Sequence, residues 1–291
     1  MPRVGVIGVG AMGMGITRAL LARGFEVIVR DIVPEREAEA VQAGASSVAS
    51  AAEMARQVDI LMTVVVDAEQ TREVLVIPDA ASRQRSGIQL QVVMMCSTIA
   101  PSDTEQIAQQ LGDIPMLDAP ISGGPARAHA GTLSVMASGS ETAFAHCAPV
   151  LDAMAAKIFR ISDRPGDGSR MKVVNNMLAA ANLAAGCEAM AMASRMGLDL
   201  RQAADVVNAS SGGSWIFADR MGRALAGDYA PRAAARVLLK DVGLFVGEAR
   251  NLGLTAPMAE CAREIFHDTV ARGYGEEDDA AVLKRYVEAW R

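Results

Sequence analysis

Hydrophobic positions in the first 160 residues fall in short runs of Val, Ile, Leu and Met that alternate with longer stretches rich in Ala and charged residues. Short apolar runs between helical patterns are typical of parallel βαβ units, whose strands are covered on both faces. We therefore predict strands at residues 3–8, 26–30, 60–65, 92–95, 116–118, 133–137 and 157–160. The helices between them are predicted at residues 14–23, 34–43, 51–57, 103–111 and 141–153.

The strand pattern ends after residue 160. Pro165-Gly166-Asp167-Gly168 is a cluster of turn-forming residues, and every longer segment that follows has a helical pattern. We predict helices at residues 169–196, 201–209, 215–226, 232–252, 257–273 and 279–290. The predicted fold is thus an α/β domain over residues 1–164, followed by an all-α domain over residues 165–291 that begins with a long interdomain helix.

Composition narrows the class of protein. Hydrophobic residues make up 51% and charged residues 21% of the chain, a balance typical of a globular protein with a sizeable core. A net charge of −6 and a pI of about 5.2 leave no basic excess for nucleic acid. The most apolar helix contains Asn175, Asn176, Asn182 and Glu188, and the N-terminus lacks the pattern of a signal peptide. We expect a cytoplasmic protein without a membrane span.

The cysteines and histidines give no sign of a metal centre. Four cysteines, Cys96, Cys147, Cys187 and Cys261, lie far apart without a Cys-x-x-Cys pair, and the three histidines are equally scattered. Neither a disulfide framework nor a metal site is predicted from such spacing. We expect each cysteine to behave as a small buried hydrophobic residue.

A glycine-rich segment follows the first predicted strand and opens the first predicted helix. It reads Gly8-Val9-Gly10-Ala11-Met12-Gly13. In dinucleotide-binding proteins the first glycine of this pattern permits a tight turn, the second lets the backbone approach the pyrophosphate, and the third lets helix and strand pack closely. The helix N-terminus then offers N–H groups to the phosphates. The segment predicts a Rossmann-type doubly wound sheet with a dinucleotide at Gly8, Gly10, Ala11, Met12 and Gly13.

The end of the second predicted strand bears on the choice of cofactor. Asp31 lies about 20 residues past the glycine loop, where an acidic residue binds the adenosine ribose hydroxyls. A carboxylate there repels a 2′-phosphate, which favours NAD over NADP, although Arg30 or Arg36 could reach such a phosphate. The alternative is that Asp31 only caps a helix.

Two more strand ends are expected to border the cofactor, because ligands of such sheets bind beyond the carboxyl ends of the strands. Val65 and Val66 follow one of these strands, and Ser97 and Thr98 follow the next. We predict cofactor contacts at Val65, Val66 and Thr98. Capping of the helix that starts near Pro101 is an equal alternative for Ser97 and Thr98.

Four ordered blocks of the sequence carry a family resemblance. They are the glycine loop; Asp118-Ala119-Pro120-Ile121-Ser122-Gly123-Gly124 with Ala130-Gly131-Thr132-Leu133; Gly166-x-Gly168-x-x-x-Lys172-x-x-Asn175-Asn176; and Lys240-Asp241-Val242-Gly243-Leu244. In this order and at this spacing they resemble the β-hydroxyacid dehydrogenase family over nearly the whole chain. The resemblance implies hydride transfer between a nicotinamide and the hydroxyl-bearing carbon of a small hydroxy acid.

The third block resembles the family's catalytic helix. Lys172 matches the catalytic lysine, and a partly buried lysine can take up the proton that a hydroxyl loses as its hydride leaves. Asn176 lies four residues further on the same helical face, where it can hold the substrate hydroxyl or the lysine. Asn175 points about 100° away and ranks second, as a substrate contact. The alternative is that Lys172 is a solvated surface lysine, which its apolar surroundings in the sequence argue against.

The remaining matches are to substrate and cofactor residues. Ser122, Gly123 and Gly124 resemble the loop that receives the substrate carboxylate, with a ligand-free glycine turn as the alternative. Lys240 resembles a second lysine of the family that lies near the nicotinamide. The alternative is that Lys240 is a surface lysine. Ser214 and Trp215 match a segment that closes over the substrate, with a core anchor as the competing interpretation of Trp215.

The C-terminal half is most similar to the L-threonate dehydrogenase branch, whereas Asn175-Asn176 is similar to the 3-hydroxyisobutyrate branch. We therefore expect an NAD-dependent enzyme for a four-carbon sugar acid such as L-threonate. The alternatives are 3-hydroxyisobutyrate dehydrogenase, tartronate semialdehyde (2-hydroxy-3-oxopropionate) reductase, an imine reductase, and a non-catalytic dinucleotide-binding protein. An Ala-rich long helix that can pack on several sides predicts an oligomer, and the family resemblance implies a homodimer or homotetramer.

Overall fold

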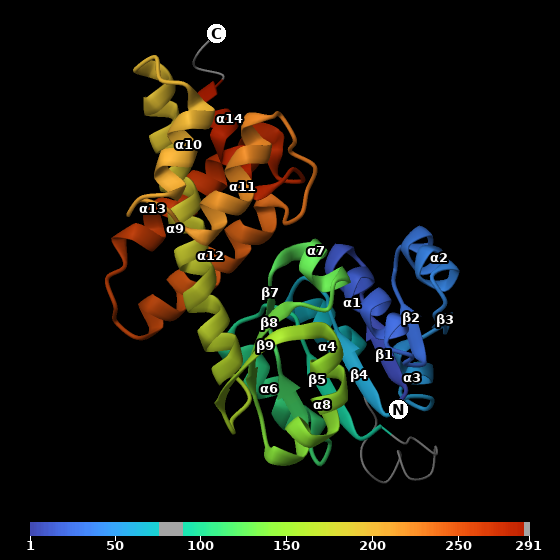
Figure 1. The fold of residues 1–291 in the computed structure, drawn as a ribbon. Coiled ribbons are helices and arrows are strands. Elements are labelled where there is room, and N and C mark those ends of the chain that lie inside the picture. Colours follow the sequence, from blue (N-terminus) through green and yellow to red (C-terminus); the bar gives the residue numbers. More distant parts are fainter. Residues whose placement is uncertain (76–89, 288–291) are drawn as a thin grey trace. The chain divides into compact units, whose positions relative to one another are not determined.

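The computed structural model describes residues 1–75 and 90–287, and the chain divides into two compact units. Unit 1 spans residues 1–172 and contains the sheet, and unit 2 spans residues 173–291 and is helical (Figure 1). Each unit is described by itself below.

Unit 1 is built on a nine-stranded sheet in the order β3-β2-β1-β4-β5-β6-β8-β7, with β9 paired to β8. The strands from β3 to β6 are parallel, β8 runs antiparallel to β6 and β7, and β9 is parallel to β8. The order 3-2-1-4-5-6 is that of a dinucleotide-binding fold. The strands are β1 (Val4–Ile7), β2 (Val27–Arg30), β3 (Ser46–Ser47), β4 (Ile60–Thr63), β5 (Val92–Met95), β6 (Met116–Asp118), β7 (Ile121–Ser122), β8 (Leu133–Ser138) and β9 (Ala155–Ser162).

Side chains of the central strands alternate between two cores. In β5, Val92 and Met94 belong to one core, and Val93 and Met95 belong to the other. The first core is covered by α1 (Ala11–Ala22), α2 (Pro34–Gln42), α7 (Gly124–His129) and α8 (Glu141–Met154), and the second by α3 (Ala51–Met54), α4 (Ala68–Val74) and α6 (Pro101–Leu111). Strands buried on both faces need apolar residues at every position, which explains their continuous apolar runs.

Three features of unit 1 differ from the sequence-based expectation. The antiparallel β8 breaks the all-parallel pattern, and the short elements β3, β7, α4 and α7 lie in stretches where no element was predicted. β9 was expected to be covered on both faces, but nearly all of its residues are exposed. The physical reason is that β9 lies at an edge of the sheet beyond β8, where the side chains of Lys157 and Arg160 are exposed to solvent.

Unit 2 is formed by helices around a core of its own. The long helix α9 (Asp167–Arg195) begins in unit 1 and continues into unit 2. It is followed by α10 (Leu200–Asn208), α11 (Trp215–Leu225), α12 (Ala235–Asn251), α13 (Pro257–Thr269), a π-helical turn η1 (Val270–Tyr274), a 3₁₀ helix η2 (Asp279–Leu283) and α14 (Lys284–Val287). The helix predicted at 279–290 is thus split into η2 and α14, and residues 288–290 lie outside the described residues.

The long helix α9 supplies the centre of the core of unit 2. Leu183, Cys187 and Met190 of α9 pack in one cluster with Phe217 of α11 and Phe266 of α13. By length and composition alone α9 could cross a membrane, a test that core helices of globular proteins also pass. Its buried stripe and its polar residues are those of a core helix.

A buried group of charges ties α11 to η2 within unit 2. Arg220 Nε donates to Asp279 Oδ1 at 2.8 Å, and it lies 3.5 Å from Asp278 Oδ1. All three side chains are almost fully buried. Burial and the neighbouring Asp278 carboxylate raise the pKa of Asp279 to about 7.

Candidate functional site

The glycine loop joins β1 to α1 by close backbone contacts. A Cβ atom added to Gly13 would lie 1.9 Å from the carbonyl oxygen of Gly8, and one added to Gly8 would lie 2.5 Å from the carbonyl oxygen of Val64. A Cβ on Gly10 would meet, within 4 Å among the described residues, only Arg36 Nη1 at 3.7 Å. Gly8 and Gly13 are therefore required for packing, whereas Gly10 opens onto free space.

The N-terminus of α1 has the features of a phosphate site. Gly10 is the N-cap residue and supplies no side-chain cap, and Ala11, Met12 and Gly13 form the first turn. The first N–H groups of a helix have no partner within the helix and carry a partial positive charge, so they suit a bound anion.

Asp31 lies at the end of β2 and binds the glycine loop. Its Oδ2 accepts a hydrogen bond from Val9 N at 2.7 Å, and its Oδ1 accepts one from Val33 N at 2.9 Å. The helix α2 begins after Val33 and has no side-chain cap, so the capping alternative for Asp31 is wrong. Each carboxylate oxygen can accept a second hydrogen bond, and a ribose hydroxyl can supply it.

Arg30, the residue before Asp31, is already paired. Arg30 Nη1 lies 2.9 Å from Glu37 Oε2 on α2. Arg30 Nη1 also donates to the Asp31 carbonyl oxygen, so this side chain is held beside α2. Arg36 is exposed and lies beside Gly10.

The loops after β4 and β5 meet at the same edge of the sheet. Val65 N donates to Ser97 Oγ at 3.1 Å, and Val64 contacts Gly8 as described above. Val66 is half-exposed, and Thr98 directly follows Ser97. The N-cap of α6 is Ala100, without a side-chain cap, so the capping alternative for Ser97 and Thr98 is wrong.

These loops fit an NAD molecule. The free space at Gly10, the uncapped first turn of α1 and the Asp31 carboxylate lie at the carboxyl ends of β1 and β2, and the β4 and β5 loops border them. Pyrophosphate, ribose and nicotinamide binding need this combination of backbone donors, a carboxylate and an apolar wall.

Lys172 is buried near the start of α9. Its side chain is 7% exposed, and its Nζ donates to the carbonyl oxygen of Ile121 at 2.7 Å. The alternative of a solvated surface lysine is therefore wrong. Ile121 precedes Ser122 in β7, so the amine lies next to the start of the Ser122-Gly123-Gly124 loop.

This loop has a backbone that only glycine adopts easily. Gly123 has a φ of 136° and Gly124 a φ of 75°. Gly123 is the N-cap of α7, and within residues 1–75 and 90–287 the N–H groups of Gly123 and Gly124 have no hydrogen-bond acceptor. Together with the Ser122 hydroxyl they can receive a carboxylate.

A second polar cluster lies in unit 2. Asn176 Nδ2 donates to Asp241 Oδ2 at 2.6 Å, and Asn176 Oδ1 accepts from Asn175 Nδ2 at 3.0 Å. Lys240 Nζ lies 2.8 Å from Asp241 Oδ1. The structure therefore joins Asn176 and Lys240 through one buried carboxylate. Asp241 was not among the predicted site residues, although its place in the Lys240-Asp241 pair is a signal that could have found it.

Ser214 and Trp215 lie at the start of α11. Ser214 Oγ accepts from Phe217 N at 3.3 Å and is the N-cap of this helix. Trp215 is 50% exposed, so it is not a core anchor, and Phe217 fills that role.

Three of the four cysteines are buried like hydrophobic residues. Cys96, Cys147 and Cys187 are buried, as expected, whereas Cys261 is exposed. Burial raises the pKa of Cys147 to about 12, which makes its thiolate a minor species at neutral pH.

Two family models together match almost the whole chain. Residues 3–162 match the NAD binding domain of 6-phosphogluconate dehydrogenase, and residues 166–286 match the NAD-binding domain of NADP-dependent 3-hydroxyisobutyrate dehydrogenase.

Individual proteins are similar over the same length. L-threonate dehydrogenase of Escherichia coli (strain K12) is 41% identical over 97% of this chain and 93% of its own. NAD-dependent L-serine dehydrogenase of Pseudomonas aeruginosa is 32% identical over 98% of both chains. A crystal structure of 3-hydroxyisobutyrate dehydrogenase from Salmonella typhimurium superposes with a TM-score of 0.87 at 42% identity, over 97% of this chain and 99% of that chain.

Proposed function

We propose that this chain oxidises a four-carbon sugar acid such as L-threonate. The chain belongs to the β-hydroxyacid dehydrogenase family and is therefore an NAD-dependent enzyme acting on CH–OH groups. Relatives named L-threonate dehydrogenase are 38–41% identical over 97% of the chain, which supports this substrate. The observation that carries the proposal is the buried amine of Lys172 beside the Ser122-Gly123-Gly124 loop.

Lys172 is the general acid/base in this proposal. Bound NAD supplies the acceptor for the hydride that leaves the hydroxyl-bearing carbon. The hydroxyl proton moves to the unprotonated Nζ of Lys172 as the carbon–oxygen double bond forms, so charge and atoms balance. In the reverse direction the ammonium returns this proton to the carbonyl oxygen. Asn176, one turn further along α9, orients the reacting hydroxyl.

The substrate and cofactor contacts in this proposal are those expected from the glycine loop, the strand ends and the family resemblance. Ser122, Gly123 and Gly124 bind the substrate carboxylate, and Asn175, Ser214 and Trp215 bind its remaining hydroxyls. NAD is held by Gly8, Gly10, Ala11, Met12, Gly13, Asp31, Val65, Val66, Thr98 and Lys240. In this proposal residues 1–164 are the NAD-binding domain, and residues 165–291 are the substrate and oligomerisation domain.

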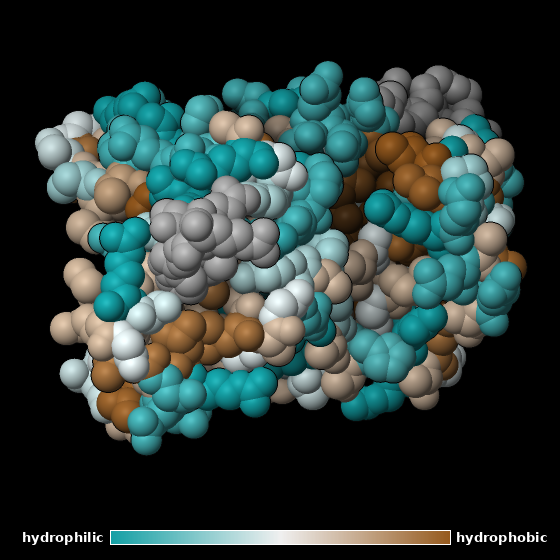
Figure 2. Space-filling model, turned by 90° about the horizontal axis from the view of Figure 1, so that it is seen from above, coloured by the Kyte–Doolittle hydropathy of each residue, from teal (hydrophilic) through white to brown (hydrophobic). Residues whose placement is uncertain are grey.

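We further propose a cytoplasmic homodimer or homotetramer. Val174, Leu178, Met192 and Met196 are exposed at helical spacing on or just after α9, although a monomer gains stability by burying such side chains. The face drawn in Figure 2 also carries separate hydrophobic patches between hydrophilic areas. Light scattering coupled to size exclusion tests the assembly, and a monomer at all concentrations would exclude it.

The substrate is tested by following NADH formation with a panel of acids. L-threonate is expected to give the highest kcat/KM among L-threonate, 3-hydroxyisobutyrate, D-glycerate, L-serine and 4-hydroxybutyrate, with NAD preferred over NADP. The highest value for 3-hydroxyisobutyrate or, in the reverse direction, tartronate semialdehyde would select one of the alternative substrates. Lys172→Ala is expected to lower kcat by at least about 100-fold with an unchanged Kd for NAD.

A further inference from the structure

Asp118 is a buried carboxylate that the proposed chemistry does not use. It is the last residue of β6, and its side chain is fully buried. Its Oδ2 accepts from Gly166 N at 2.8 Å, Ser169 N at 2.9 Å and Ser138 Oγ at 3.2 Å, and its Oδ1 accepts from Ser169 Oγ at 2.8 Å. Two of these donors are backbone N–H groups at the start of α9. Asp118 therefore provides the hydrogen bonds that the first turn of this helix lacks.

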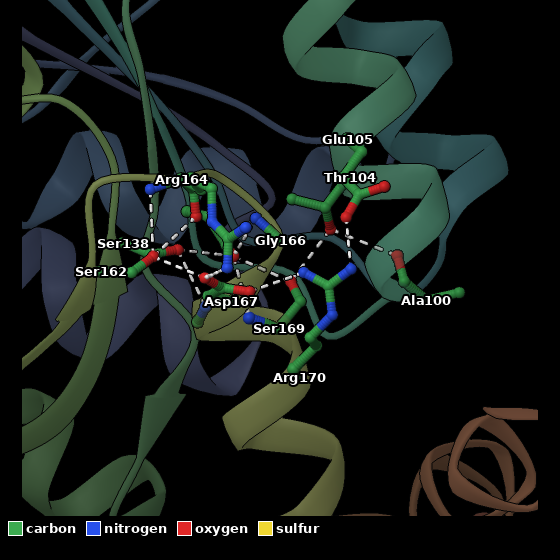
Figure 3. Close-up of polar contacts among 12 residues, drawn as sticks. Ala100, Thr104, Glu105, Ser138, Ser162, Arg164, Gly166, Asp167, Ser169 and Arg170 are labelled. Carbon is green, nitrogen blue, oxygen red and sulfur yellow. Dashed lines mark hydrogen bonds and ion pairs between the residues drawn. The ribbon is translucent and has the colours of Figure 1, made fainter. Parts of the chain in front are cut away.

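Further contacts fix the same turn from other sides (Figure 3). Ser138 Oγ accepts from Gly168 N at 2.8 Å, so Ser138 bridges α9 to Asp118. Ser169 Oγ lies 2.9 Å from Thr104 Oγ1 on α6. A Cβ on Gly168 would lie 2.5 Å from the carbonyl oxygen of Met136, so the first turn of α9 packs directly on β8.

Three ion pairs lie next to these buried hydrogen bonds. Arg164 and Arg170 pair with Asp167, and Arg170 also pairs with Glu105. Both arginines are largely exposed, and exposed ion pairs contribute little to stability or to precise placement. The buried contacts of Asp118 are the ones that define where α9 begins.

The position of Lys172 depends on this beginning. Lys172 follows Ser169 by three residues, which is just under one helical turn. Its amine binds the carbonyl of Ile121, and Ile121 follows Asp118 by three residues in the same segment. The segment 118–121 thus holds α9 at two points, with Asp118 at the helix start and Ile121 at the lysine.

We propose that Asp118 is a positioning residue that sets the start of α9 and thereby aims the Lys172 amine at Ile121 and the adjoining loop. This inference rests on the proposed role of Lys172. A helix start that shifts or frays displaces the amine, and a displacement of about 1 Å can cost about 100-fold in rate.

Asp118→Ala and Asp118→Asn test this role as a pair. Alanine removes every acceptor, whereas asparagine keeps one oxygen for Gly166 N and Ser169 N, and its amide can donate to Ser169 Oγ. We expect Asp118→Ala to lower kcat by about 10- to 100-fold, with KM and the Kd for NAD within about 3-fold. Asp118→Asn is expected to recover most of kcat.

Lysine labelling gives a readout that does not depend on turnover. The chain has four lysines, Lys157, Lys172, Lys240 and Lys284. Treatment with an amine-acylating reagent followed by peptide mass spectrometry measures the rate at each one. In the parent protein Lys172 is buried and hydrogen-bonded, so we expect slow labelling. Asp118→Ala should accelerate labelling of Lys172 several-fold and leave exposed Lys157 unchanged.

The control is Asp59→Ala. Asp59 Oδ2 accepts from Arg3 N at 2.8 Å, so this variant also removes a carboxylate that binds backbone, but far along the chain from α9. It should leave kcat and Lys172 labelling unchanged. If Asp118→Ala does not fold, Ser138→Ala and Ser169→Ala replace it, with smaller expected losses of about 3- to 10-fold in kcat.

The outcomes separate this inference from the proposed function. Folded Asp118→Ala with parental kcat and parental Lys172 labelling overturns the positioning role, as do parental values in both serine variants. Full activity of Lys172→Ala overturns the general acid/base proposal instead. In that case labelling still measures whether Asp118 places the amine.

Discussion

The two lysines of the polar clusters differ in the group that binds them. Lys172 donates to a backbone carbonyl, which is uncharged, whereas Lys240 lies against the Asp241 carboxylate. A carbonyl oxygen accepts a hydrogen bond from the lysine, whereas a carboxylate forms an ion pair with it. The Ile121 carbonyl places the Lys172 amine beside the Ser122-Gly123-Gly124 loop, and the Asp241 carboxylate places Lys240 beside Asn176.

At the same scale, Asp31 binds the glycine loop and, in the proposed function, favours NAD over NADP. Replacing Asp31 with Asn keeps one oxygen for Val9 N but removes the charge that repels a 2′-phosphate. We expect the Kd for NAD to rise about 10-fold, a loss of about 1.4 kcal/mol, and the Kd for NADP to rise less. Fluorescence titration with both cofactors measures this change.

Glu35→Gln is the control for Asp31→Asn, because Glu35 is an exposed carboxylate in the first turn of α2. It removes the same charge nearby without touching the glycine loop. We expect both dissociation constants to stay within about 2-fold of the parent. An unchanged NAD to NADP ratio in Asp31→Asn would contradict the role assigned to its charge.

At the scale of elements, the β1–loop–α1 unit separates packing from ligand binding. In Gly13→Ala the new Cβ would overlap the backbone at Gly8, whereas in Gly10→Ala, among residues 1–75 and 90–287, it would have Arg36 alone within 4 Å. We expect Gly13→Ala to lower the free energy of unfolding by about 2 kcal/mol or more, through overpacking. Gly10→Ala should keep parental stability but weaken NAD binding at least about 10-fold.

Thermal unfolding without and with NAD tests this glycine pair. The parent and Gly10→Ala should unfold at the same temperature without NAD, and only the parent should be stabilised strongly by added NAD. Gly13→Ala should unfold earlier under both conditions. Equal NAD stabilisation of Gly10→Ala and the parent would mean that the pyrophosphate does not approach this backbone.

The central strands could be predicted because their pattern is local. The apolar runs of β1, β4 and β5 reflect burial on both faces, and this burial leaves a direct trace in the sequence. β7 and α7 have two and six residues, too few to display a period. The exposure of β9 depends on which strand lies beside it, and its own residues do not specify that.

The candidate site was predictable in part for the same reason. Glycine loops and strand ends are defined by neighbouring residues, so the places of Gly8 and Gly10 after β1 and of Asp31 after β2 could be predicted from spacing. The contact of Asn176 with Asp241 joins residues 65 positions apart, and that of Asp118 with Ser169 joins residues 51 apart. Such pairs form only when the packed elements bring them together, so single-sequence reasoning does not identify them.

At the scale of the whole molecule, the two units have separate cores, and each core encloses charged side chains. Unit 1 buries Asp118 and Lys172 beside its sheet, and unit 2 encloses Arg220, Asp278 and Asp279 among its helices. A buried carboxyl group whose pKa differs between the folded and unfolded states makes stability depend on pH. We therefore expect the stability of unit 2 to depend on pH through Asp279.

Asp279 determines whether the free energy of unfolding of unit 2 rises or falls with pH. Its pKa is about 7 in the folded chain and about 4 in an unfolded one, so the folded state holds an extra proton between these values. The free energy of unfolding of unit 2 should fall as pH rises from about 4 to about 7, by at most about 1.4 kcal/mol per pH unit, and then level off. Asp279→Asn should remove this slope, because asparagine keeps an acceptor for Arg220 but does not titrate.

Tryptophan fluorescence isolates the response of unit 2, because both tryptophans, Trp215 and Trp290, belong to residues 173–291. Urea unfolding at several pH values, followed by this signal, gives the slope for the parent and for Asp279→Asn. Asp228→Asn is the control, since Asp228 is a more exposed carboxylate near Arg223 and Arg232. It should keep the parental slope. The same slope in Asp279→Asn as in the parent would assign the pH dependence to other groups, because the proton held by Asp279 is then not released on unfolding.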